Sequence, residues 1–338
     1  MYEIKSFTEI EDKEKFINDF SSLPENLQQF PERTLPPTQY WKFLITQLSS
    51  IKKELFLAYD GENIIGRVSA NTYTPDPSLG FWGCLEFDIK HPQVRFLLLK
   101  HANNWLKQQK VKRSVGPINF STWFNYRYKT KVTTHSFDWE PTTPNHYYQT
   151  LDKEGYEIDK SFISALYKSF YPLHEYTKKH YQKTLESGYT FSHVDSSDEK
   201  NIDEIFSLTL HSFKQSYLYE NISEGQFKGI FLNFIKNQNA EYIFTIHSPE
   251  DKKVGIVYAF SDQDFLVVKT IAISPEFQKL NLGNALLHHC FSAAKKDGLS
   301  KLVAAMVREG NNSLKFLEHL DQLIDKNEYH LLGKNLSL

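Results

Sequence analysis

Apolar and polar positions alternate along the chain in segments that predict strands and helices in turn. In the first half we expect strands at 2–7, 54–60, 64–73, 81–87 and 161–170, and helices at 11–20, 37–49 and 91–110. The turn at Asp60 and Gly61 joins two alternating strands and favours a hairpin. For the helix at 91–110, we expect an apolar face made of Val94, Leu97, Leu98, His101 and Trp105.

The second half repeats this order of elements. It predicts strands at 189–195, 240–248, 253–261, 264–273, 302–309 and 328–336, and helices at 198–213, 225–237, 281–298 and 312–320. A polar segment at 171–188 is the expected junction, with a boundary near residue 180. With 338 residues, the chain exceeds the usual ~100–200 residues of one domain. We therefore expect two domains, 1–180 and 181–338.

Composition and charge narrow the functional classes. Hydrophobic residues make up 40% of the chain and charged residues 24%, as in ordinary globular proteins. The formal net charge of -2 provides no global field for nucleic acid or an anionic membrane. Cys84 and Cys290 lie among apolar residues, which indicates buried reduced thiols and no metal site. The N-terminus has no apolar signal core, and no run of about 18 apolar residues occurs, so we expect a cytoplasmic protein without membrane contact.

The most informative motif follows the predicted strand at 264–273. Pro275 and the loop at 278–285 lead from this strand into a helix. A helix start presents backbone N–H groups and a positive dipole end, which together favour an anion. Gly283 and Ala285 are small enough for a diphosphate to approach the main chain, and Gln278 could add a donor. The loop fits neither the three-glycine dinucleotide pattern nor the Gly-Lys-Ser/Thr phosphate loop.

This loop resembles the phosphate loop of the GNAT superfamily of acyl-coenzyme A-dependent N-acyltransferases. The family pattern is Gln/Arg-x-x-Gly-x-Gly/Ala after a strand that usually ends Val-x-Pro. Here Ile273 and Pro275 end the strand, Gln278 and Gly283 match, and Asn281 replaces the first glycine. Asn tolerates left-handed backbone better than most residues, so we expect the loop to survive.

A second landmark of that family is an Asn-x-x-Ala/Ser segment, which residues 311–317 resemble. Many members carry a Tyr there that protonates the leaving thiolate, but Leu317 stands at that position. Together the resemblance implies acetyl-CoA or another acyl-CoA as co-substrate. It implies the following contacts with the coenzyme: Ile271, Ala272, Ile273, Gln278, Lys279, Leu280, Asn281, Leu282, Gly283, Asn284, Ala285, Asn312 and Phe316.

Segments 116–122, 136–141, 145–157 and 267–278 resemble a little-characterised bacterial GNAT group of about this length. The resemblance implies an α/β (α+β) fold of two tandem GNAT-like domains, each a mixed, largely antiparallel twisted sheet flanked by helices. The first domain has no coenzyme loop after its strand at 81–87, so we expect it to be degenerate and to shape or cover the substrate site.

Several polar residues leave two interpretations open. Lys269 interrupts an apolar strand, and it is either an edge residue that reaches water or a residue near the thioester. Tyr258 is a core residue or a proton donor, and Glu309 is a solvated carboxylate or a site residue. We expect one of His288 and His289 to face the core and the other solvent, without a metal.

The sequence thus predicts an N-acyltransferase that moves an acetyl or other acyl group to an amine of a small molecule or peptide. Two alternatives remain: a transferase of long-chain acyl or aminoacyl groups, and a non-catalytic coenzyme-A-binding protein. The basic runs that tRNA would require are missing from the sequence. Tyr258 and Lys269 are the catalytic candidates, and the oligomeric state is not predicted.

Overall fold

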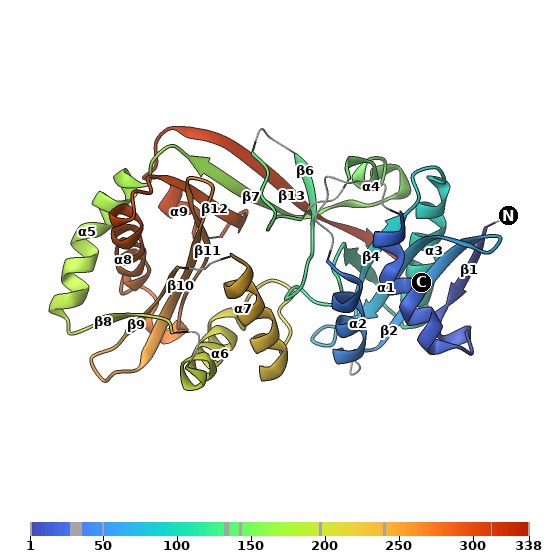
Figure 1. Cartoon of the computed structure of the whole chain (residues 1–338), viewed down its shortest axis with the longest axis horizontal. Coiled ribbons are helices and arrows are strands. Elements are labelled where there is room, and N and C mark those ends of the chain that lie inside the picture. The colour runs from blue at the N-terminus through green and yellow to red at the C-terminus, as the bar shows by residue number, and fades with distance from the viewer. Residues whose placement is uncertain are drawn as a thin grey trace. The chain divides into compact units, whose positions relative to one another are not determined.

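The computed structural model describes residues 2–27, 36–48, 51–131, 135–141, 144–195, 198–238, 241–311 and 313–336. The chain forms two compact units (Figure 1). The first contains Met1–Val132, Ser136–Ser161 and Tyr329–Leu338, and the second contains Thr133–His135 and Phe162–Glu328. The chain therefore enters the second unit and returns to the first with its last ten residues.

The first unit is built on a sheet of strands that are mostly antiparallel. The neighbouring strands are, in order, β1 (Glu3–Ser6), β2 (Lys53–Asp60), β3 (Asn63–Thr72), β4 (Leu79–Phe87), β5 (Arg113–Gly116) and the end of β13 (Leu323–Asn335). Among the strand registers of the described residues in this unit, β4 and β5 pair in parallel and the others are antiparallel. The remaining elements are η1 (Phe7–Glu9), α1 (Lys13–Leu27), α2 (Thr38–Gln47), α3 (Gln93–Gln108), β6 (Tyr128–Lys131), α4 (Asn145–Tyr148) and η2 (Asp152–Glu154).

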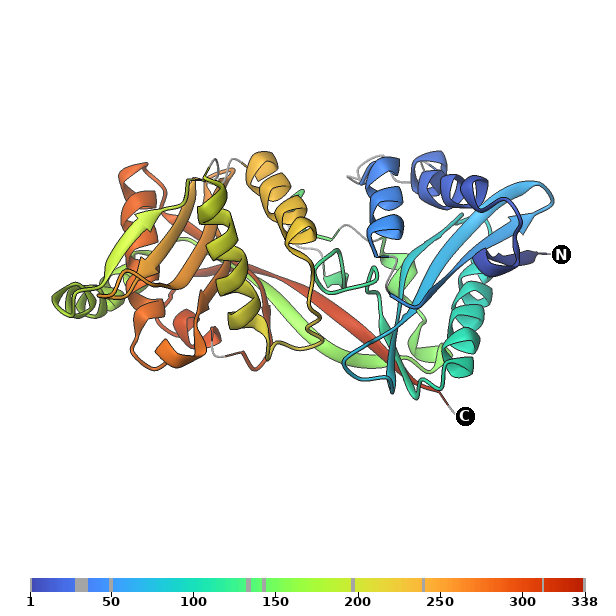
Figure 2. The same ribbon diagram turned by 90° about the horizontal axis from the view of Figure 1, so that it is seen from below.

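Helices cover both faces of this sheet (Figure 2). Helix α3 packs on one face, whereas α1 and α2 lie together on the other. The predicted apolar face of α3 is partly wrong, because the helix is rotated relative to that expectation. Its buried residues are Val94, Leu98, Leu99, Ala102, Asn103 and Leu106. His101 is exposed, and Leu97 and Trp105 are only half-buried.

The second unit repeats the plan. Its sheet runs in the order β7 (Glu157–Tyr167), β12 (Lys301–Arg308), β11 (Phe265–Ile273), β10 (Lys253–Asp262), β9 (Tyr242–His247) and β8 (Thr190–His193). The other elements are α5 (Tyr171–Glu186), α6 (Glu199–Phe213), α7 (Glu224–Gln238), η3 (Pro275–Phe277), α8 (Leu282–Lys296) and α9 (Leu314–Leu317). In the registers of the described part of this unit, β11 and β12 pair in parallel and the other pairs are antiparallel.

Helices lie on both faces of this second sheet. Helix α8 packs on one face with α5 beside it, and Val257, Leu266 and Leu286 belong to the core between them. Helices α6 and α7 lie on the opposite face, against β10 and β11 (Figures 1 and 2). The fold is therefore the predicted one of mixed, largely antiparallel sheets flanked by helices.

Strands β7 and β13 each serve both units. Residues 162–167 of β7 pair with β12 in the second unit, and residues 332–335 of β13 pair with β5 in the first. Each unit thus contains a strand contributed by the other half of the chain. The predicted boundary near residue 180 lies within α5.

The segment 171–188, where the sequence predicts the junction, contains α5, which packs against α8. The segment is polar overall, but Leu173, Thr177 and Thr184 recur at helical spacing and are buried. Among the described helices, none is long and apolar enough to cross a membrane.

Candidate active site

The candidate site begins at an irregularity in β11. Tyr258 pairs with Thr270 and Ala259 pairs with Val268, so Lys269 is an extra residue in β11 opposite β10. The alternation of the side chains shows the same insertion. Leu266 and Val268 pack toward the α8 core before the bulge, whereas Ile271 and Ile273 do so after it. A β-bulge of this kind bends the strand and changes the direction of its backbone groups.

Beyond this bulge, β11 separates from its parallel neighbour. The register between β11 and β12 ends at Val268 and Ala304, although β12 continues to Arg308 and stays paired with β7 on its other edge. In the registers of the described residues, 270–273 pair with β10 alone. Most of β11 from Val268 onward is accordingly only half-buried. An edge of this kind offers backbone donors and acceptors to an extended ligand that contains amides.

The start of α8 lies directly after this edge. Ser274 ends the strand, η3 follows, and Lys279 and Asn281 take left-handed backbone with φ of 73° and 60°. Helix α8 then begins at Leu282, and Ala285 makes the first N–H bond back, to the carbonyl of Asn281 at 3.2 Å. The N–H groups of Leu282, Gly283 and Asn284 are therefore the first N–H groups of the helix, which we call the leading N–H groups. Within an α-helix such leading N–H groups have no acceptor, and the dipole makes this end positive.

The side chain of Asn281 does not cap the helix. It accepts instead from Nδ2 of Asn284 at 3.4 Å. Asn284 is 9% exposed, and among the described residues no donor reaches its Oδ1 atom. The helix start thus keeps its backbone donors available and adds a buried amide carbonyl. This combination suits a ligand that carries both anionic groups and amide groups.

Gly283 borders an apolar wall beside these donors. A Cβ atom at this position would lie 3.6 Å from Cζ of Phe316, 3.7 Å from Cδ1 of Ile271 and 3.9 Å from Cγ1 of Ile273. Three of the predicted coenzyme contacts therefore meet around Gly283. Ala272 is buried, and so are Leu282 and Ala285 in the helix.

Other predicted residues lie around the same loop in different roles. Gln278 donates from Nε2 to the carbonyl of Ile273 at 3.2 Å, so it bridges the loop to the strand end. Lys279 and Leu280 are exposed, and Leu280 is 53% accessible. Asn312 lies outside the described residues. Next to it, Oδ1 of Asn311 accepts from the N–H of Ser313 at 2.9 Å, and α9 follows with the half-buried Leu317.

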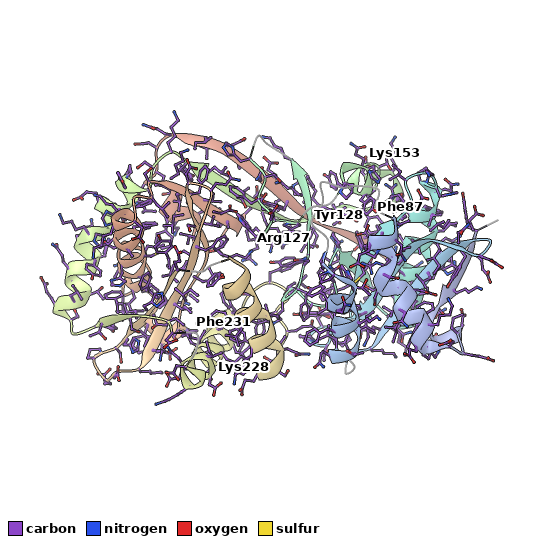
Figure 3. All side chains as sticks on the ribbon, in the orientation of Figure 1. Phe87, Arg127, Tyr128, Lys153, Lys228 and Phe231 are labelled. Carbon is purple, nitrogen blue, oxygen red and sulfur yellow. The ribbon has the colours of Figure 1, made fainter. Side chains whose placement is uncertain are left out.

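Tyr258 lies beside the bulge on the face covered by α6 and α7. It is 6% exposed, and its ring centroid lies 6.0 Å from that of Phe231 on α7, which Figure 3 labels one turn after Lys228. Burial raises the pKa of the Tyr258 phenol above its ordinary value. The hydroxyl is therefore a neutral proton donor throughout the physiological range of pH.

Two predictions about isolated residues have clear outcomes. Cys84 and Cys290 are free and buried, as expected, and burial raises the pKa of the Cys84 thiol to about 11. Of the two adjacent histidines, His288 faces the core, as expected for one of them, and is 7% exposed. His289 is half-buried and stacks on Phe191 with ring centroids 4.8 Å apart, so it is less exposed than expected. Among the described residues, no group of three or more His, Cys, Asp or Glu side chains could hold a metal ion.

The sequence analysis missed the end of the parallel register at Val268 and Ala304, which defines where the open edge begins. The sequence does contain a signal for the bulge. The apolar positions that face the α8 core are even-numbered before Lys269 (266 and 268) and odd-numbered after it (271 and 273). Glu309 directly follows β12 and is exposed, away from the α8 core.

Comparison with known proteins agrees with this geometry. Residues 202–321 match the model of the acetyltransferase (GNAT) family. No curated protein sequence matches the chain.

Solved structures share the fold at low sequence identity. A tandem GNAT protein from the clavulanic acid biosynthesis pathway has a TM-score of 0.52 at 8% identity, with 100% of this chain and 99% of that chain covered. A probable N-acyltransferase of unknown function from Enterococcus faecalis has a TM-score of 0.57 at 12% identity, with 99% and 73% covered.

A further structure contains the GCN5-related glucosamine N-acetyltransferase region of a fungal multi-domain GH3 beta-N-acetylglucosaminidase. It has a TM-score of 0.52 at 11% identity and covers 98% of this chain, but this chain spans only 38% of its length. The family match includes the bulged strand β11, the loop and the start of α8. Residues 202–321 thus match the acetyltransferase (GNAT) family, and the chain shares its fold with a tandem GNAT protein.

Proposed function

We propose that the second unit transfers an acetyl or other acyl group from coenzyme A to an amine of a small molecule or peptide. The observation that carries this proposal is the adjacency of two features. The open edge of β11 at 270–273 leads within a few residues to the uncapped start of α8. The first suits the amides of a pantetheine arm, and the second suits a diphosphate.

In this arrangement the diphosphate would accept hydrogen bonds from the N–H groups of Leu282, Gly283 and Asn284. Asn281 and Lys279 provide the left-handed residues that turn the loop toward the helix axis. Phe316, Ile271 and Ile273 form an apolar border around Gly283, against which the methylene groups of the arm can pack. The coenzyme is a co-substrate here and not a permanently bound group.

The chemical step is direct attack of the amine nitrogen on the thioester carbonyl. The N–C bond forms, the C–S bond breaks, the amine loses one proton, and the coenzyme thiolate gains one. A backbone N–H at the bulge of β11 would stabilise the oxyanion that develops on the carbonyl. Tyr258 is the proton donor we propose for the thiolate, because it pairs with Thr270 beside the bulge and burial keeps its phenol neutral.

Lys269 is the residue inserted at the bulge, and we propose that it lies near the acyl group. The acceptor amine must be neutral to attack, so activity should rise with pH until the amine is deprotonated. The composition suits a cytoplasmic enzyme, and the formal net charge of -2 gives no reason to expect a nucleic acid acceptor.

The test has two steps on the intact chain. Mass spectrometry of the purified protein should detect copurifying coenzyme A species, and acetyl-CoA should then release thiol in the presence of a suitable amine from a panel. Binding without turnover against small-molecule, peptide and aminoacyl acceptors would favour a coenzyme-binding protein. Turnover only with long-chain acyl-CoA would favour the larger acyl donor.

A further inference from the structure

The first unit contains a second strand with the geometry of β11. Its parallel register with β5 ends after Phe81, which pairs with Val115. Arg67 pairs with Glu86 and Ser69 pairs with Gly83, so β4 carries one more residue than β3 between these pairs. Cys84 lies in this interval with φ of 51°. Strand β4 therefore has both features that open the edge of β11: a bulge, and a parallel pairing with its neighbour that ends after a few residues.

In the first unit, however, the chain itself occupies this edge. The N–H of Ile118 donates to the carbonyl of Trp82 at 2.8 Å, and the N–H of Cys84 donates to Oδ1 of Asn119 at 2.7 Å. The segment 116–120, which begins with the last residue of β5, thus bonds to β4 on both sides of Gly83. These are the backbone groups that an added extended ligand would need.

The fit of this segment leaves no space for another chain. A Cβ atom at Gly83 would lie 2.1 Å from the carbonyl oxygen of Ile118, and one at Gly116 would lie 2.4 Å from the Trp82 side chain. Ile118 and Phe120 are fully buried, and Nδ2 of Asn71 donates to the carbonyl of Phe120 at 3.0 Å. The glycines and the buried amide explain why the segment packs this closely on the strand.

The start of α3, the helix that follows β4, is also less suited to a diphosphate than the start of α8. Helix α3 begins after Pro92, which has no N–H to donate, and the carboxylate of Asp88 accepts from the N–H of Lys90 at 2.9 Å. The N–H of Val94 donates to the carbonyl of His91, also at 2.9 Å. A carboxylate and satisfied donors at this turn disfavour a diphosphate, because the anion would meet a like charge and find few donors.

We propose that residues 116–120 permanently occupy, in the first unit, the strand edge that receives the pantetheine arm in the second. Asn119 is the residue that closes this edge, because its side chain takes the bulge N–H of Cys84. The chain consequently binds one coenzyme, and the first unit is a closed scaffold. The number of coenzymes rests on the proposed function, whereas the closure itself does not.

Hydrogen exchange on the intact protein tests the closure, read by mass spectrometry with residue-level fragmentation. The Cys84 amide should be protected without coenzyme, and acetyl-CoA should leave its exchange rate unchanged. Asn119→Ala should increase that rate by about tenfold, the scale of one lost buried hydrogen bond. Asn119→Asp, which keeps an acceptor, should retain most of the protection, and the exposed control Asn104→Ala should have no effect.

A Cys84 amide that exchanges freely without coenzyme, or gains protection when acetyl-CoA is added, would overturn the closure. The same experiment reports separately on the second unit. If acetyl-CoA does not slow exchange at 270–273, the proposed function fails while the closure at Cys84 can still hold. A titration of the wild-type chain that saturates at two coenzymes would also overturn the proposal.

Discussion

Replacing Gly283 by alanine should raise the stability of the protein, whereas replacing it by valine should lower its affinity for coenzyme. Gly283 is the second residue of α8 and has ordinary helical backbone, so alanine introduces no backbone strain. The added Cβ meets its nearest neighbour at 3.6 Å, an ordinary packing distance. Alanine in place of glycine within a helix stabilises by about 0.5–1 kcal/mol. For a unit of this size, about 1 kcal/mol corresponds to a rise in Tm of about 2–4 °C.

The family pattern allows alanine at this position, so its methyl group should leave coenzyme binding unchanged. The larger, branched side chain of Gly283→Val should instead crowd the ligand at the leading N–H groups, because three side chains already border this position. Loss of one hydrogen bond to a charged ligand costs about 1.5–3 kcal/mol, which weakens binding by about 10–100-fold. Differential scanning calorimetry and isothermal titration with acetyl-CoA measure the two effects separately.

Gly225→Ala and Gly225→Val provide the matched controls, because Gly225 is also the second residue of its helix and a Cβ there would meet nothing within 4 Å. Gly225→Ala should gain similar stability, and both variants should keep the wild-type affinity. If Gly283→Val leaves the affinity unchanged, or if Gly225→Val weakens it equally, the start of α8 is not the anion site.

Three further outcomes follow from the structure. Because Asn281 has φ of 60°, Asn281→Gly should retain stability and coenzyme binding. Asn281→Val should lower the free energy of unfolding in urea by about 1–2 kcal/mol. Equal stability of the two variants would contradict this. Tyr258→Phe should slow turnover by about 10²–10⁴-fold with unchanged acetyl-CoA affinity, and unchanged turnover would make Tyr258 a core residue only. Burial and the adjacent His288 lower the pKa of His174 to about 4. The neutral His174 therefore contributes to stability fully above the pKa of the unfolded state, about 6.5, and this contribution is lost as pH falls toward 4. Unfolding in urea should therefore occur at lower concentration as pH falls from 7 to 4, and His174→Gln should reduce this dependence; an identical slope in the variant would refute the assignment.

The sequence was sufficient for the parts of the fold that local patterns determine. Most strands of both sheets show period-two alternation or continuous apolar runs, and the start of α8 shows a loop that matches a known family, so their positions could be predicted. The four-residue strand β5 is too short to show such a pattern and was not predicted. Helix α5 could not be recognised, because its polar composition hides a narrow buried stripe at Leu173, Thr177 and Thr184. Only packing against α8 distinguishes that stripe from a linker.

The exchange of strands between the units was also beyond prediction. Local patterning shows that 328–336 is a strand, but not that its end pairs with β5 more than two hundred positions earlier. This topology has a practical consequence. A fragment ending at residue 180 would lack the strand that follows β5 in the first sheet, so every experiment described above uses the intact chain.

The closed edge of β4 shows a similar limit. Residues 116–122 were recognisable as a segment shared with a protein group, but the sequence does not show that Asn119 bonds to the N–H of Cys84. That contact depends on a bulge and on two glycines, Gly83 and Gly116, whose roles appear only when the two segments are placed together.

The most direct test of the coenzyme site is isothermal titration of the intact chain with acetyl-CoA, comparing the wild type with Gly283→Glu. The glutamate would extend from the start of α8 into the space for the diphosphate and place a negative charge there. Circular dichroism and thermal unfolding confirm that the variant remains folded. We predict saturable binding by the wild type and none by the folded variant. Equal affinity of the two proteins, or no binding by the wild type, would contradict the assignment of this site.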